Sequence, residues 1–114
     1  MLSRIVNKLM GSASAPAIAH EDLVKLHADA GCTVVDVREP HEFARGHIPG
    51  AVNLPLSRFD PARVPQSERV VLICQAGARS AAALQKMTAS GRLDAQHYAA
   101  GMSGWRARGG PVAM

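Results

Sequence analysis

Short apolar runs and longer segments of helical periodicity alternate along this chain. The short runs predict buried strands over residues 33–37, 51–54, 69–73 and 95–98. The helical spacing of apolar residues predicts helices or helical turns over residues 21–29, 39–43, 79–90 and 103–108. Residues 56–64 have a mixed pattern that indicates one short helix. Alternating strands and helices predict an α/β domain with a small, mostly parallel central sheet of about five strands, flanked by helices on both faces.

The first sixteen residues differ in character from the rest of the chain. Their apolar residues share one side of a predicted helix: Leu2, Ile5, Val6, Leu9 and Met10. The small-residue run 11–16 ends that helix, so we expect residues 1–16 to be an amphipathic helix and linker and residues 17–114 to be a single domain. Asn7 and Lys8 interrupt the apolar stretch that a signal peptide needs. The helix either docks on its own domain or frays, or it contacts a second copy of the chain or a membrane surface.

Composition narrows the function classes. With 114 residues, of which 47% are hydrophobic, the chain can bury a core of its own and is not a disordered segment. Two cysteines are too few for a disulfide scaffold or a four-cysteine zinc site, and we expect neither a metal nor an organic cofactor. No apolar run is long enough to span a bilayer. The lack of a credible signal or membrane segment, together with the nucleophilic thiol that we expect at Cys74 for the reasons below, favours a cytoplasmic protein.

The net charge of +4 fits either a nucleic acid or a small anion. The basic residues are scattered, and only Arg106 and Arg108 lie close together. Aromatic residues make up 4% of the chain, too few for a stacking platform for single-stranded nucleic acid. A small anionic substrate is therefore the better expectation, with no nucleic-acid partner.

Cys74 is placed where open parallel sheets bind their ligands, at the carboxyl end of a predicted strand and just before a helix. The loop after it carries small residues, so its N–H groups can turn inward as an anion-binding nest beside the positive end of the helix. Arg79 adds a charge, and the Ser80 hydroxyl can cap the helix or donate to an anion. These features favour the thiolate, so we expect the pKa of Cys74 to lie below that of a free thiol. The alternative is a small buried core residue.

Cys32 serves as a comparison within the same chain. It opens an apolar strand with no positive charge beside it, which indicates a role in core packing. A Cys32–Cys74 disulfide remains open, although the spacing matches no C-x-x-C redox pair. Two further residues have structural interpretations. We expect His47 to hydrogen-bond within a turn and Trp105 to pack beneath the last helical turn.

Three blocks of the sequence, in the expected order, resemble rhodanese-domain sulfurtransferases. The active-site loop is similar over 74–80, the upstream signature over 36–39 and 43–54, and the C-terminal signature over 101–105. The resemblance runs from about His20 to Pro111. It departs at Ala78, where some members place a charged or polar residue, and at Ala100, where the family often has glycine.

The resemblance implies a parallel sheet flanked by helices and a cysteine persulfide intermediate, formed on Cys74 as the catalytic residue. Sulfur would pass from an anionic donor such as thiosulfate to a thiophilic acceptor, either cyanide or a thiol, including a protein thiol. The residues expected to bind substrate are Gln75, Ala76, Gly77, Ala78, Arg79, Ser80 and Arg38. A monomer or a homodimer fits this chemistry.

Two other functions compete with this interpretation. Cysteine-loop phosphatases and arsenate reductases have one more residue between cysteine and arginine than the four that stand here. A module that only relays persulfide sulfur would carry the same residues. Arg38 and Arg79 either touch substrate or form ion pairs, and we expect Asp36 and Glu39 to form ion pairs that hold the loops.

Overall fold

The structure is a computed structural model that describes residues 16–114, so the predicted helix over the first residues lies outside the described range. The helices and strands are α2 (His20–Ala28), β1 (Thr33–Asp36), α3 (Pro40–Ala44), β2 (Val52–Asn53), β3 (Val70–Ile73), α4 (Ala78–Ala89), β4 (Ala95–His97) and α5 (Gly101–Ala107). Outside residues 1–16 and 56–64, each predicted strand and helix is present, with ends shifted by two residues at most. Within residues 16–114, no helix has the length and apolar character that crossing a membrane requires.

The one segment of different type is 56–64. In place of a single helix it forms two 3-10 turns, Leu56–Arg58 and Pro61–Arg63. Pro61 has no N–H to continue a helix from the first turn, so a new turn starts there. The Asp60 side chain caps this second turn by accepting the Ala62 N–H at 2.9 Å.

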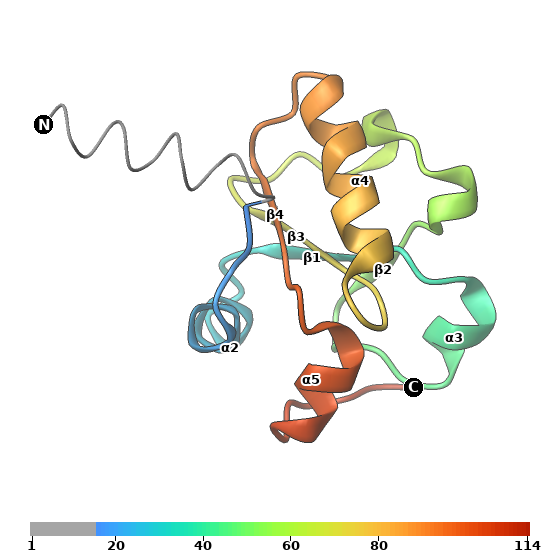
Figure 1. The fold of residues 1–114 in the computed structure, drawn as a ribbon. Coiled ribbons are helices and arrows are strands. Elements are labelled where there is room, and N and C mark those ends of the chain that lie inside the picture. The colour runs from blue at the N-terminus through green and yellow to red at the C-terminus, as the bar shows by residue number, and fades with distance from the viewer. Residues whose placement is uncertain (1–15) are drawn as a thin grey trace, which may run out of the picture.

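The sheet has the strand order β2-β1-β3-β4, and all its pairings are parallel (Figure 1). This confirms the predicted α/β class, but the expected count of about five strands is one too many for the described residues. Beyond β4 only a single-residue bridge forms, between Ala17 and His97. It cannot lengthen into a strand because Pro16 lacks an N–H and α2 begins at His20.

Successive residues of the central strands point to opposite faces of the sheet, and each face has its own core. On one face Leu72 packs in a cluster with Leu84 and Met87 of α4. On the other face Val71 packs in a cluster with Leu23 of α2 and Trp105 of α5. Helices therefore cover both faces, as predicted (Figure 1). The predicted packing role of Trp105 is confirmed by its complete burial.

Two leucine-to-alanine changes test this assignment of the core. Leu72 is fully buried, whereas Leu93 is 79% exposed. Because Leu72→Ala opens a cavity, we expect it to lower the free energy of unfolding by about 2–5 kcal/mol, and Leu93→Ala to change it by about 0.5 kcal/mol or less. Urea denaturation followed by the fluorescence of the single tryptophan measures both. Equal losses in the two variants would contradict the assignment.

Candidate functional site

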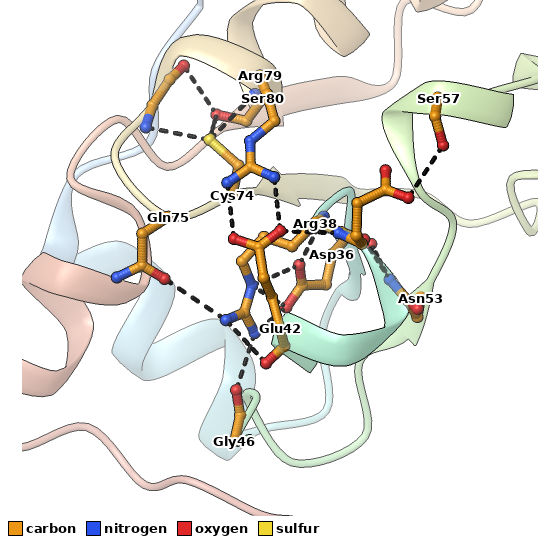
Figure 2. A network of polar contacts seen from close by, with 12 residues as sticks. Asp36, Arg38, Glu42, Gly46, Asn53, Ser57, Cys74, Gln75, Arg79 and Ser80 are labelled. Atoms are coloured by element: carbon orange, nitrogen blue, oxygen red, sulfur yellow. Dashed lines mark hydrogen bonds and ion pairs between the residues drawn. The ribbon is translucent and has the colours of Figure 1, made fainter. Parts of the chain in front are cut away.

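The sulfur of Cys74 lies in a cradle of backbone N–H groups where β3 ends and α4 begins. The Gly77 N–H donates to the sulfur at 3.1 Å and the Ser80 N–H at 3.3 Å (Figure 2). The Ser80 hydroxyl oxygen is 3.6 Å from the same sulfur. The Ser80 N–H is one of the free donors of the first turn of α4, which starts at Ala78. The inward N–H groups expected from the small-residue loop are thus present.

Glycine is required at two places where this loop meets the segment before α5. Gly77 has φ +105°, and a Cβ there would collide with the carbonyl oxygen of Ala99. Gly101 has φ +63°, and a Cβ there would collide with the Gln75 carbonyl oxygen. Both residues combine a left-handed backbone with a contact that leaves no room for a side chain. The two segments can therefore approach backbone to backbone.

The first turn of α5 takes up the carbonyl groups of the loop. Met102 N–H donates to the Cys74 carbonyl at 2.9 Å, and Ser103 N–H donates to the Gln75 carbonyl at 3.1 Å. The Gln75 side chain also donates to the Ser103 hydroxyl at 2.9 Å. The Gln75 carbonyl shares its peptide unit with the Ala76 N–H, so holding this carbonyl on the α5 side turns the Ala76 N–H toward the Cys74 sulfur. The signature over 101–105 could be found in the sequence, but this contact could not.

The environments of the two cysteines push their acidities in opposite directions. Burial raises the pKa of Cys74, but hydrogen bonds from the Ser80 side chain and from the backbone N–H groups of Ser80, Gly77 and Ala76 outweigh it and lower the pKa overall. Burial raises the pKa of Cys32, offset in part by the charge of Arg69. Both cysteines are free, so the disulfide left open by the sequence is not formed. Cys32 is half-buried against the core on the α2 side, as expected.

The Arg79 side chain reaches the Glu42 carboxylate of α3 (Figure 2). Its guanidinium donates to both carboxylate oxygens of Glu42, at 2.7 and 2.9 Å. Hydrogen bonding to Arg79 lowers the pKa of Glu42 to about 2, so the pair stays ionised over the whole range in which a thiol titrates. Glu42 also accepts the Glu39 N–H at 3.0 Å. The spacing of these two glutamates at the start of a helix, typical of a capping box, is the one sequence feature that could have singled out Glu42. Arg79 therefore forms one of the two ion pairs considered from the sequence, and its contact with substrate stays a prediction.

Arg38 is buried, with 3% of its surface exposed, and also forms an ion pair. It grips the buried Asp36 carboxylate through Nε at 2.9 Å and Nη2 at 2.7 Å. Nη2 also donates to the Gly46 carbonyl at 2.8 Å, while Nη1 reaches the Glu42 carbonyl at 3.3 Å. Arg38 therefore connects the end of β1 to the turns beside the Cys74 loop. This confirms the expectation that Asp36 forms an ion pair. Contact of Arg38 with substrate stays a prediction.

Of the predictions for His47 and Glu39, the first is confirmed and the second is wrong. His47 is a turn hydrogen-bonder as predicted: its Nδ1 lies 2.9 Å from the Phe43 carbonyl oxygen. Glu39 was expected in an ion pair, but its carboxylate instead accepts the hydroxyl of the exposed Ser57 at 3.1 Å, because Glu42 takes the nearby arginine. Among residues 16–114, no group of three His, Cys, Asp or Glu side chains is arranged to hold a metal.

Residues 19–108 match the rhodanese-like domain family. The chain is 41% identical to an uncharacterized protein of Synechocystis over 97 residues, which cover 83% of this chain and 54% of that protein. It is 31% identical to the human thiosulfate:glutathione sulfurtransferase over 109 residues, which cover 82% and 95% of the two chains. A rhodanese-related protein from Thermoplasma volcanium superimposes with a TM-score of 0.76 at 31% identity, over 86% of this chain and 97% of that one. The chain spans about half the length of the first curated relatives that it matches.

The opposite shifts of the two thiols predict different alkylation profiles. Because the thiolate is the reactive form, the pH of half-maximal alkylation by iodoacetamide reports the pKa of each thiol. We expect that pH to lie below about 8.5 for Cys74 and above it for Cys32. Cys32→Ser and Cys74→Ser leave one thiol each for the measurement, and each profile is scaled to its own plateau to remove differences in access. A midpoint for Cys74 at or above that of Cys32 would refute the prediction.

A second pair of variants separates the close approach at Gly77 from its backbone conformation. Gly91 also has a positive φ, +87°, but a Cβ there would meet nothing within 4 Å. We expect Gly91→Ala to lower stability by about 1–2 kcal/mol, the cost of the left-handed backbone, and to leave the pKa of Cys74 unchanged. Gly77→Ala should cost more and raise the pKa of Cys74. Urea denaturation and the alkylation profile give both quantities, and indistinguishable results for the two variants would rule out the cradle as described.

Proposed function

Because this chain belongs to the rhodanese-like domain family, we propose that it is a thiosulfate sulfurtransferase-type enzyme whose catalytic residue is Cys74. It moves sulfane sulfur from an anionic donor such as thiosulfate to a thiophilic acceptor, cyanide or a thiol, through a persulfide on Cys74. The observation that carries this proposal is the cradle of N–H groups on the Cys74 sulfur, which favours the thiolate. The name of the human relative, a thiosulfate:glutathione sulfurtransferase, supports the choice of donor.

In the first step the Cys74 thiolate attacks the outer sulfur of thiosulfate. A sulfur–sulfur bond to Cys74 forms, and the bond between the two sulfurs of thiosulfate breaks, with its electron pair leaving on sulfite. The negative charge then lies on the outer sulfur of the persulfide. Donors already pointing into the loop stabilise this charge without having to reorganise.

In the second step the acceptor attacks the outer persulfide sulfur. With cyanide the carbon forms the new bond and thiocyanate leaves. With a thiolate the product is the acceptor's own persulfide. In both cases the sulfur–sulfur bond to Cys74 breaks and its electron pair returns to Cys74 as the thiolate, so the cycle needs no external oxidant or reductant.

The residues after Cys74 bind the donor through the backbone. Gln75, Ala76, Gly77 and Ala78 form the loop, and the first turn of α4 adds the Ser80 N–H and hydroxyl. Arg79 and Arg38 contribute as fixed charges, each already paired with a carboxylate. The donor's charge is therefore met mainly by N–H dipoles, and a small anion is favoured over a large polyanion that would need several unpaired cations.

Intact-mass measurement after addition of thiosulfate tests the persulfide. We expect the wild-type protein and Cys32→Ser to gain the mass of one sulfur atom, and a thiol reductant to remove it. Cys74→Ser should gain nothing, because its hydroxyl is neither ionised nor nucleophilic toward sulfur at neutral pH. An adduct that persists on Cys74→Ser would overturn the assignment. Release of phosphate from an aryl phosphate, with no sulfur adduct, would favour a phosphatase in its place.

A further inference from the structure

Behind the cradle, Cys74, Ser80 and His97 form a line of polar side chains in a buried place. The Ser80 hydroxyl oxygen lies 3.6 Å from the Cys74 sulfur and 2.9 Å from His97 Nδ1. His97 ends β4, where it pairs with Leu72 of β3, two residues before Cys74. Only 6% of His97 is exposed. His97 lies 23 positions from Cys74 in the sequence and comes close to it only through the pairing of β3 with β4.

The Ser80 hydroxyl has one hydrogen and three acceptors within reach. These are the Gly77 carbonyl at 3.1 Å, His97 Nδ1 and the Cys74 sulfur. If Nδ1 is unprotonated it takes this hydrogen, and Ser80 can then only accept a hydrogen from a neutral Cys74 thiol. If Nδ1 carries a hydrogen, it donates to the Ser80 oxygen. The hydroxyl hydrogen is then kept away from the ring and is available to a negatively charged sulfur.

His97 is held so that its ring stays beside Ser80. Its backbone is fixed on the far side from β3 by two hydrogen bonds of 3.0 Å, from Ile18 N–H to the His97 carbonyl and from His97 N–H to the Pro16 carbonyl. Burial lowers the pKa of His97, so the ring is neutral near pH 7 and its hydrogen can sit on either nitrogen.

We propose that His97 is a positioning residue for Cys74: it donates from Nδ1 to Ser80 and thereby directs the Ser80 hydroxyl onto the sulfur when the sulfur is a thiolate. His97 itself does not touch the sulfur, and it acts through the side chain of Ser80. The inference rests on the proposed function in taking Cys74 as the nucleophile. Its chemical content, however, is the stability of the Cys74 thiolate, which is measurable without any sulfur donor.

Two polar replacements of His97 distinguish the effect of its Nδ1 hydrogen-bond donor from the effect of the size of its side chain. Asn places its amide nitrogen near the former Nδ1 position, whereas Gln places its amide nitrogen near Nε2, out of line with Ser80. All variants carry Cys32→Ser, so only Cys74 reacts. We expect His97→Asn to keep the wild-type pH of half-maximal alkylation by iodoacetamide. We expect His97→Gln to raise it by about one unit, the effect of losing one hydrogen bond to a charged acceptor.

The same pair in a Ser80→Ala background shows whether Ser80 is the route. There the difference between His97→Asn and His97→Gln should vanish, because no hydroxyl remains to be directed. Equal alkylation midpoints for the two replacements with Ser80 present, or an equal difference with and without Ser80, would overturn the proposal. The two proposals can fail separately. If His97→Gln raises the alkylation midpoint but the protein forms no sulfur adduct with thiosulfate, the sulfurtransferase function is refuted and this role of His97 stands.

Discussion

Everything at this site depends on the N–H groups of Gly77 and Ser80 pointing at one sulfur atom. A peptide unit that turns its N–H inward turns its carbonyl outward, and buried carbonyls need donors as much as the sulfur does. The peptide unit that presents the Ala76 N–H to the sulfur carries the Gln75 carbonyl, which accepts the Ser103 N–H of α5, and the preceding Cys74 carbonyl accepts the Met102 N–H. The cradle is therefore made by two helix starts together: α4 gives its free N–H groups to the sulfur, and α5 gives its own to the carbonyls of the loop. The close packing at Gly77 and Gly101 keeps the two in register.

The two arginines beside the cradle are each paired with a carboxylate, so they add little net charge to it. Arg79 is neutralised by Glu42, and Arg38 by Asp36, with Arg38 more deeply buried. Glu42 remains ionised down to a pH of about 2, so its partner is not released in any range where the thiolate forms. A free arginine at the rim would attract anions of any shape by charge alone. With both arginines paired, the negative sulfur is held by the short-range geometry of the N–H groups.

The sequence predicts the parts of this site that are local and misses those that depend on tertiary contacts. Cys74 at a strand end, the small-residue loop and the helix after it lie in one stretch, so their arrangement follows from backbone rules. The partnership of Glu42 with Arg79 joins residues 37 positions apart, and that of His97 with Ser80 depends on the pairing of β3 and β4. The error over 56–64 has a local cause, since Pro61 blocks a continuous helix. The expected count of about five strands had no fifth segment behind it, and beside β4 the described residues form only the Ala17–His97 bridge.

Burial and hydrogen bonding act on the Cys74 thiolate with opposite signs, and this makes the site sensitive to small displacements. Burial disfavours the charged sulfur wherever the loop lies, whereas the N–H and hydroxyl donors help only at hydrogen-bond distance. If the loop loosened without becoming solvated, burial would still raise the pKa of Cys74, but the hydrogen bonds that lower it would be lost. The pKa of Cys74 would then be raised, as that of Cys32 is. Because the folded state holds the pKa of Cys74 below its unfolded value, ionisation at higher pH stabilises the fold, while the raised pKa of Cys32 has the opposite effect. The same geometry that favours the Cys74 thiolate thus contributes to holding the loop closed around it.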